Sequence, residues 1–282
     1  MRAKRVVAVV WAIMASMALA LPASGQLLSN ELLLPPRALA MGGASTGMRN
    51  ELEVSLGNPA GLSQLRRSGL AGAAAIAGDI DFVGAGVFGV SSTRERQYAF
   101  TLLDIEDDQL GSNSTVVGGT ISYDAGERLS VGTTIKWLFN NPSGGDSNDY
   151  LTADVGFQYR VSPESERCAI VGAVISNIFN ETSAGIDPGT QFAFGAQGEL
   201  SDKVLIAADV ADLFNAGPGG AIFRAGVEVE FGDNILIRAG VNEGDSSVGA
   251  AFESGKARIE VGWRPDTGVR DDIVTVGASS TF

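Results

Sequence analysis

The side chains that could do chemistry in this chain are mainly charged ones, because it contains no histidine and a single cysteine, Cys168. Without histidine, the Ser-His arrangements that activate a hydroxyl nucleophile are excluded, and so are histidine metal ligands. A lone cysteine cannot form an intramolecular disulfide. We therefore expect a protein that is not an enzyme and has no cofactor and no metal site.

Charged residues of both signs occupy alternate positions of neighbouring predicted strands near the carboxyl end. Alternate positions of a strand point to one face, so these side chains are expected to meet inside the molecule. One interpretation is an ion-pair network that satisfies a narrow interior; the other is an ion-selective or gated path. The residues are Arg224, Glu228, Arg238, Arg258, Glu260 and Arg264.

The chain begins with the pattern of an export signal. Residues 2–5 carry three basic side chains, residues 6–20 are apolar and uncharged, and small residues follow at Ala23 and Gly25. This pattern predicts a cleaved signal peptide over residues 1–25. No second long apolar stretch follows. A membrane protein of this kind must be a closed barrel, because unpaired backbone groups are costly in lipid.

Fourteen segments of about ten residues follow, each long enough to cross a membrane at barrel tilt. An even count returns the last strand beside the first. We therefore expect an all-β fold, an antiparallel transmembrane β-barrel of about 14 strands over residues 67–282. The predicted spans are 68–77, 82–91, 96–104, 114–123, 129–139, 150–161, 168–178, 190–200, 203–214, 221–231, 234–242, 246–253, 257–264 and 273–282.

The two faces of these segments differ in chemistry. In 129–139, for example, Ile135 and Trp137 alternate with Thr134 and Lys136. A lipid-facing charge costs roughly 2–4 kcal/mol at the membrane midplane, so a bilayer would enforce such alternation. A soluble β-sandwich also alternates and is the alternative. Aromatic residues near strand ends, typical of interfacial girdles, favour the barrel; they are Tyr123, Trp137, Tyr159, Phe214, Phe231 and Trp263.

Short connections alternate with longer ones, which assigns the short turns and both chain ends to the periplasm. The net charge of −13 is concentrated in the longer, outer connections. Nucleic acid is therefore a poor partner. The acidic rim has three interpretations: a solvated face, an adaptation to a salty habitat, or divalent cations that bridge residues 104–108 to lipid phosphates.

Residues 26–66 do not have the pattern of a spanning strand. Gly42 and Gly43 allow positive φ or a close approach to another chain segment, and Asn58 with Pro59 initiates a turn. A segment of this kind, placed before the first strand, could fold back into the barrel as a hatch or plug. An ordinary periplasmic lead-in is the alternative.

The stretches RALAMGGA (37–44) and NPAGL (58–62), followed by a barrel, resemble the amino-terminal region of the FadL-like outer-membrane superfamily. That superfamily contains long-chain fatty-acid and hydrocarbon transporters and the PorV/PorQ proteins associated with type IX secretion. The resemblance implies a fourteen-stranded barrel whose internal hatch carries Asn58, Pro59 and Ala60. Gly42 and Gly43 belong to the same predicted hatch or plug.

Two functions remain open for a barrel in the bacterial outer membrane. The loops lack long apolar insertions that capture greasy substrates, which favours a PorV/PorQ-type member with a secretion-associated or structural docking role and secretion-system partners. The alternative is passive transport of a hydrophobic small molecule. The inward faces drawn from the pattern contain few apolar candidates for that role, namely Val116, Ile222 and Leu236.

The last residue, Phe282, falls on the same strand face as Val274 and Val276. A terminal aromatic on such a face resembles the assembly signal read by the barrel-insertion machinery. We therefore expect that machinery and outer-membrane lipid as partners.

Overall fold

The computed structural model describes residues 35–49, 51–77, 81–107, 112–142, 148–161, 168–179, 181–182, 190–213, 221–265 and 272–282. The predicted signal peptide lies outside these residues. Most of the described chain is β-strand. The long strands are β1 Gly69–Ala77, β2 Asp81–Ser92, β3 Arg96–Asp107, β4 Ser112–Asp124, β5 Leu129–Pro142, β6 Asn148–Arg160, β7 Ile170–Ser176, β9 Gln191–Ser201, β10 Val204–Ala211, β11 Ile222–Phe231, β12 Ile235–Asn242, β13 Asp245–Ser254, β14 Ala257–Arg264 and β15 Ile273–Thr281.

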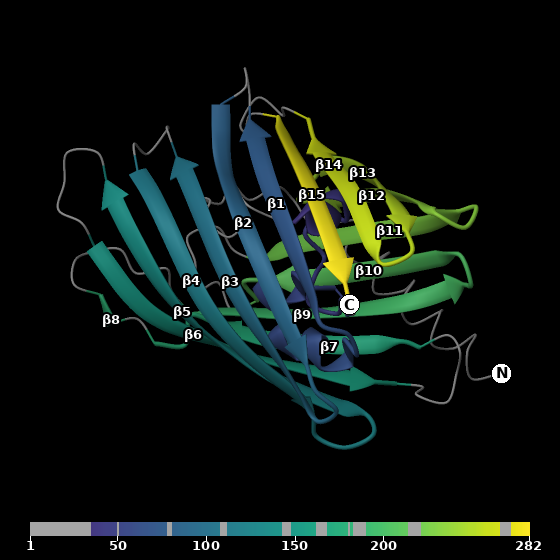
Figure 1. Ribbon diagram of the computed structural model, residues 1–282, viewed down its shortest axis with the longest axis horizontal. Helices are drawn as coiled ribbons and strands as arrows, with labels where there is room; N and C mark the ends of the chain where they lie inside the picture. The colour runs from purple at the N-terminus through teal and green to yellow at the C-terminus, as the bar shows by residue number, and fades with distance from the viewer. Residues whose placement is uncertain are drawn as a thin grey trace.

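These fourteen strands form a closed antiparallel barrel (Figure 1). The first and last strands pair along their whole length, from Gly69 opposite Thr281 to Ala77 opposite Ile273. Strands β5 and β6 pair as well, which completes the ring. The two-residue strand β8, Glu181–Thr182, adds to β6 beside this ring. A closed ring has no free sheet edge, so the sandwich alternative is wrong and the predicted barrel is confirmed.

The predicted spans agree with the observed strands to within a few residues. Strand β7 is shorter than the predicted 168–178, because it ends at Ser176. The next residue, Asn177, has φ 56°, a left-handed conformation that Asn tolerates better than most residues and that cannot continue a strand. Its backbone N–H donates to Asp154 Oδ1 at 3.0 Å.

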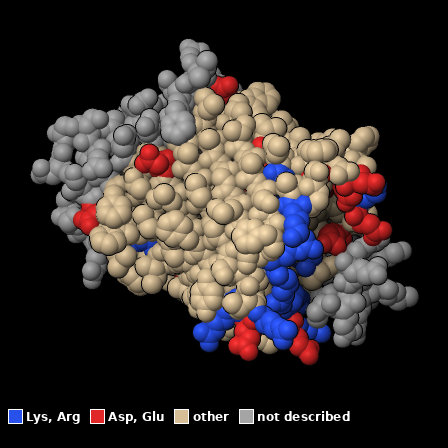
Figure 2. Space-filling model, viewed as in Figure 1, with Lys and Arg blue, Asp and Glu red and all other residues tan. Residues whose placement is uncertain are grey.

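Alternate residues of the strands face outward and inward as predicted. On β5, Ile135 is 55% exposed and Trp137 is 47% exposed, whereas Thr134 and Lys136 are buried. Most of the surface over the middle of the view in Figure 2 carries no charge, and the Lys and Arg side chains gather toward its lower right. This distribution is what a hydrocarbon environment demands of the outer wall.

Residues 35–66, here the inner segment, lie inside the ring of strands, where Figure 1 shows them in purple and dark blue. The segment contains three short helices: α2 Pro36–Ala40, η1 Val54–Leu56 and η2 Pro59–Gln64. Helix α2 packs against β12 to β15, while η2 packs against β3 to β6. The segment therefore bridges two sides of the barrel. Within the described ranges, no helix is long and apolar enough to cross a membrane.

Candidate functional site

The barrel wall approaches the inner segment most closely at glycines. A Cβ added at Gly226 would lie 2.6 Å from Met41 O, and one added at Gly132 would lie 2.6 Å from Ala60 N. Real Cβ atoms essentially never approach another heavy atom within 3.0 Å. The missing side chains thus make room for the backbone of the inner segment. Gly172, Gly240 and Gly262 also meet backbone atoms of the inner segment, whereas Gly156, Gly249 and Gly277 meet its side chains.

The predicted hatch residues Asn58, Pro59 and Ala60 are all buried, and Asn58 is 0% exposed. Asn58 has the extended conformation imposed by the following proline. Its Oδ1 accepts from Ala60 N at 3.0 Å, which caps η2. Its Nδ2 donates to Thr46 O at 2.7 Å and to Phe157 O of β6 at 3.2 Å. Asn58 therefore ties two turns of the inner segment to each other and to the wall.

Gly42 and Gly43 have φ values of 67° and 80°, a region that glycine occupies without steric cost. A Cβ on Gly42 would lie 2.6 Å from Val241 N of β12, and a Cβ on Gly43 would lie 3.1 Å from Arg224 Cδ. Both glycines therefore serve the turn after α2 and the close contact with the wall.

A second polar contact fixes the middle of the inner segment. Asp209 of β10 is 1% exposed, and its Oδ2 accepts from the backbone N–H groups of Ser45 and Thr46, each at 2.7 Å. On the other side, Gln158 Nε2 donates to Met48 O at 2.7 Å. These wall side chains satisfy backbone groups that would otherwise be unpaired inside the barrel.

The inner segment is also joined to the wall by buried ion pairs centred on Arg37. Its Nε donates to Glu228 Oε2 at 2.9 Å and its Nη2 to Oε1 at 3.0 Å, while Nη1 donates to Glu51 Oε1 at 2.8 Å. Such bidentate charge-assisted bonds are short and directional. Burial alone would lower the pKa of Arg37, but the carboxylates of Glu228 and Glu51 outweigh it and raise that pKa.

The wall side of this cluster contains four of the six predicted lumen charges. Arg238 donates to Glu228 and to Glu260, both at 2.7 Å, and Arg258 joins Glu253 of the wall and Glu51 of the inner segment. Arg224 packs against Gly43 instead, and Arg264 is buried farther along β14. Sequence reasoning missed Arg37 and Glu51, because their wall partners, Glu228 and Arg258, lie on strands distant in the sequence.

Glu53 is a buried carboxyl next to the same cluster and is 6% exposed. Burial, followed by the carboxylates of Glu260 and Glu51, raises the pKa of Glu53 from 4.5 to about 8. In contrast, burial would raise the pKa of Glu51, but Arg37 and Arg258 lower it. Two acids of one short segment therefore differ in charge at neutral pH.

The opposite side of the interior is apolar, and here the sequence interpretation was wrong. The inward residues of β2 to β5 include Phe88, Leu103, Ile105, Val116 and Leu138, each at most 6% exposed. They form one buried cluster with apolar residues of the inner segment. Val116 alone among these had been predicted as an inward apolar residue. Ile222 and Leu236, the other two named, are only half-buried.

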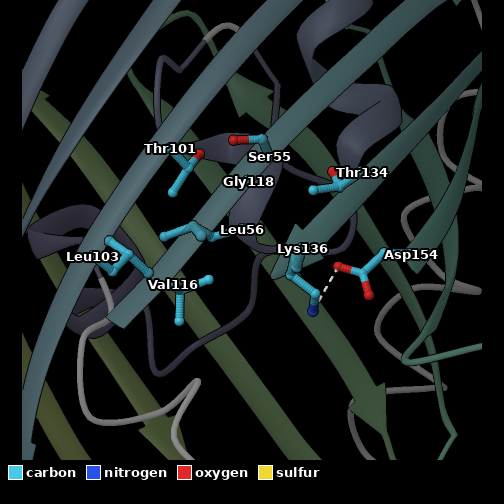
Figure 3. Close-up of a pocket in the computed structure, with 9 residues that line it drawn as sticks. All are labelled: Ser55, Leu56, Thr101, Leu103, Val116, Gly118, Thr134, Lys136 and Asp154. Carbon is cyan, nitrogen blue, oxygen red and sulfur yellow. Dashed lines mark ion pairs between the residues drawn. The ribbon is translucent and has the colours of Figure 1, made fainter. Parts of the chain in front are cut away.

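A small cavity lies between η1 and this wall (Figure 3). Leu56 of η1 and Leu103 and Val116 of the wall form its apolar part, and the ion pair of Lys136 with Asp154 at 2.9 Å lines it on the side of β5 and β6. The space open to a water-sized sphere is about 20 Å³, enough for about one water molecule.

Two other predicted features lie at the ends of the barrel. Phe282 is 68% exposed and its N–H donates to Ser68 O at 2.9 Å. Part of the predicted acidic rim lies outside the described residues; among the described acids, Asp104 Oδ1 accepts from Thr115 Oγ1 at 2.9 Å and Asp149 Oδ2 accepts from Trp137 Nε1 at 3.1 Å. The part of the chain that the structure describes contains no group of three or more acidic or cysteine side chains arranged to hold a metal ion.

No family model matches the chain, and no curated protein has a similar sequence. Solved structures are similar in fold. The toluene transporter TbuX of Ralstonia pickettii superposes with a TM-score of 0.67 at 12% identity, covering 89% of this chain and 99% of that one. The CymD monoaromatic hydrocarbon channel superposes with a TM-score of 0.65 at 13% identity, covering 90% of this chain and 99% of that one. A FadL homologue of Pseudomonas aeruginosa superposes with a TM-score of 0.59 at 9% identity, covering 92% of this chain and 100% of that one.

The barrel shares its fold with these channels. At such low identity the similarity concerns the fold alone. It agrees with the predicted FadL-like barrel architecture and does not confirm the PorV/PorQ assignment.

Proposed function

We propose that this protein is a passive channel for hydrophobic small molecules in the bacterial outer membrane, with the inner segment as its plug. The observation that carries this proposal is the buried apolar surface that β2 to β5 turn toward the lumen beside that segment. A route for an apolar solute through the lumen would require such a surface. Two of the similar structures, the CymD hydrocarbon channel and the toluene transporter TbuX, support the same function.

The domain organisation follows from this proposal. Residues 1–25 are a cleaved signal peptide, residues 26–66 the hatch, and residues 67–282 the barrel. The barrel-insertion machinery would read Phe282, whose side chain is exposed on the outer face.

The plug is held strongly on one side and weakly on the other, which suits a gate. Toward β10 to β14 it makes the ion pairs of Arg37 and the bonds to Asp209. Toward β2 to β5 it contacts the apolar cluster, and its polar bonds there lie near one end, where Ser92 Oγ donates to Leu65 O at 2.9 Å and Ser122 Oγ donates to Ala60 O at 3.3 Å. Apolar contacts lack direction, so an apolar solute can replace those made by the cluster itself.

Within the described residues, the pairing of the wall changes where β7 ends. Beyond Ser176, which is paired with Gln191 of β9, the chain turns at Asn177. It then follows β6, since Ile178 N donates to Ala153 O at 2.9 Å. Farther along, β8 pairs with β6, while Asn177 O accepts from Thr190 Oγ1 at 3.0 Å, next to the start of β9. We place the lateral route of the solute here.

Uptake by whole cells tests the proposal. A Gram-negative host without a hydrocarbon channel of its own would express the protein, and entry of labelled toluene would be compared with host cells that carry an empty vector. Faster entry of toluene supports the channel. Equal entry, with the protein shown by fractionation to be in the outer membrane, refutes it.

A further inference from the structure

The ion-pair cluster between the plug and the wall contains more carboxylates than cations. Each guanidinium group of the cluster contacts two carboxylates. The three guanidinium groups belong to Arg37, Arg238 and Arg258, and the four carboxylates belong to Glu51, Glu228, Glu253 and Glu260. The paired groups therefore already carry one negative charge in excess, and a further carboxylate at this place would lack a counter-ion.

Glu53 is a further carboxyl at this place. It lies at the N-terminal end of η1 and is 6% exposed. Its neighbour Leu52 lies against the seam of β1 and β15, since a Cβ added at Gly69 would lie 2.9 Å from Leu52 Cδ2. Within the described residues, no ion pair joins Glu53 to a cation. The charges that act on it most strongly are the carboxylates of Glu260 and Glu51.

The strands around Glu53 do not supply the missing positive charge. Strands β1 and β15 contain no charged residue. Glu230, farther along β11 toward its short turn, is another acid. Arg224 and Arg264 lie on the other side of the wall glycines that contact the plug backbone. An ionised Glu53 would therefore be a buried and unbalanced charge, which is strongly unfavourable.

A proton can consequently control how the plug is held. Burial, followed by the carboxylates of Glu260 and Glu51, raises the pKa of Glu53 from 4.5 to about 8 while the plug is in place. Between these values the seated plug keeps a proton that a displaced, water-exposed plug would lose. Arginine does not titrate in this range, Glu51 has a lowered pKa, and the chain contains no histidine.

We propose that Glu53 is a proton-operated latch, which keeps the plug seated at acidic pH and allows it to leave the wall as the pH rises. The inference rests on the proposed channel function and describes its regulation. While Glu53 is protonated, the ion pairs of the cluster hold the plug. Once it is ionised, one more negative charge enters the same dry interior, and the displaced position, where water solvates that charge, gains population.

The expected size of the effect follows from proton linkage. Loss of one proton on opening changes the ratio of open to closed barrels by about tenfold per pH unit. Between pH 5 and pH 7.5 the open probability should therefore rise by roughly 300-fold. The rise should level off above the pKa of about 8 that Glu53 has in the closed barrel, because both states are then ionised.

Two substitutions separate charge from packing. Glu53→Gln keeps the size of the side chain and is neutral at every pH, so the barrel should stay closed and the pH dependence should vanish. Glu260→Gln removes one negative charge, while its side-chain oxygen can still accept from Arg238 Nη1. Ionised Glu53 then restores the wild-type balance of charges, so this variant should stay mostly closed at pH 8. Glu95→Gln removes an exposed carboxyl at the turn between β2 and β3 and is the control.

Conductance of the purified full-length protein measures the latch. The protein is placed in planar bilayers of phosphatidylcholine, and the open probability is recorded at fixed salt from pH 5 to pH 9. Wild type and Glu95→Gln should show the expected rise, and Glu53→Gln and Glu260→Gln should not. The double variant Gly226→Ala, Gly132→Ala, in which each added Cβ would meet the plug backbone, gives the current of a displaced plug for comparison.

A wild-type open probability that stays constant or falls as the pH rises would overturn the inference, and so would an equal rise in Glu53→Gln or Glu260→Gln. Toluene entry into cells would still support the channel in that case. If the open probability rises as expected and toluene entry fails, the latch stands and the channel does not.

Discussion

Packing at the wall glycines allows a direct test of the plug. The Cβ introduced by Gly226→Ala would lie 2.6 Å from Met41 O and 2.8 Å from Met41 Cα, both backbone atoms that no side-chain rotation can move. To restore a contact of about 3.5 Å, the inner segment must shift by roughly 1 Å. Overpacking of this kind typically costs about 1–3 kcal/mol.

A second substitution acts at the other side of the plug. The Cβ introduced by Gly132→Ala would lie 2.6 Å from Ala60 N. The two positions are on β11 and β5 and contact different residues of the plug, so their effects should roughly add to about 2–6 kcal/mol. We expect each single variant to loosen the plug and the double variant to displace it.

Conductance across a planar lipid bilayer reports the displacement. Wild-type protein should pass almost no ion current, the single variants should show brief openings, and the double variant should show a steady current with a lower melting temperature. Gly119→Ala and Gly89→Ala add a methyl on the outer face, where nothing lies within 4 Å, and should behave as wild type. A double variant that stays closed and melts like wild type would refute the packing argument.

Three further predictions follow from the same contacts. The pKa of Glu53 is raised from 4.5 to about 8, so between these values the folded protein keeps a proton that the unfolded chain has lost, and stability should fall as pH rises through this range. Glu53→Gln should abolish that fall in a series of melting curves from pH 4 to 9; an equal slope in both proteins would contradict it. Arg37→Met leaves the buried carboxylates of Glu228 and Glu51 with one cation fewer and should cost about 3–5 kcal/mol, measured by chemical unfolding in detergent; a loss below 1 kcal/mol would show that these pairs do not hold the plug. Deletion of Phe282 should reduce the heat-modifiable, folded fraction in outer membranes, whereas unchanged assembly would remove its role as a signal.

Strand positions were predictable from sequence because a membrane barrel imposes a local rule. A residue that faces outward must tolerate lipid, whereas its neighbours in the strand face inward and can be polar. Trp137 and Lys136 could therefore be assigned to opposite faces from their order in the sequence. The same alternation, together with the positions of the turns, located the other strands. Asn177 ends β7 earlier than the pattern indicated, because the backbone turns there to bond with Asp154.

The apolar inner surface was missed because its strands are apolar on both faces. Leu102 is 39% exposed on the outer wall, while its neighbour Leu103 is buried inside; Val87 and Phe88 repeat this arrangement. Without alternation, the sequence does not reveal which residues face inward. In the structure, the register with the neighbouring strands determines which residues face inward.

The contacts of the plug could not be predicted because they connect residues far apart in the chain. Arg37 and Glu228 are separated by 191 positions, and no local pattern links them. The glycines of the wall posed a similar problem: Gly226 needs to be small only because Met41 lies against it.

The most direct test of the central claim compares two solutes in the same cells. Labelled toluene and a labelled sugar of similar size would be supplied to host cells that express the wild-type protein or carry an empty vector. A barrel closed to water by its plug but open to apolar molecules should speed toluene entry and leave sugar entry unchanged. Faster entry of the sugar without faster entry of toluene would contradict the account.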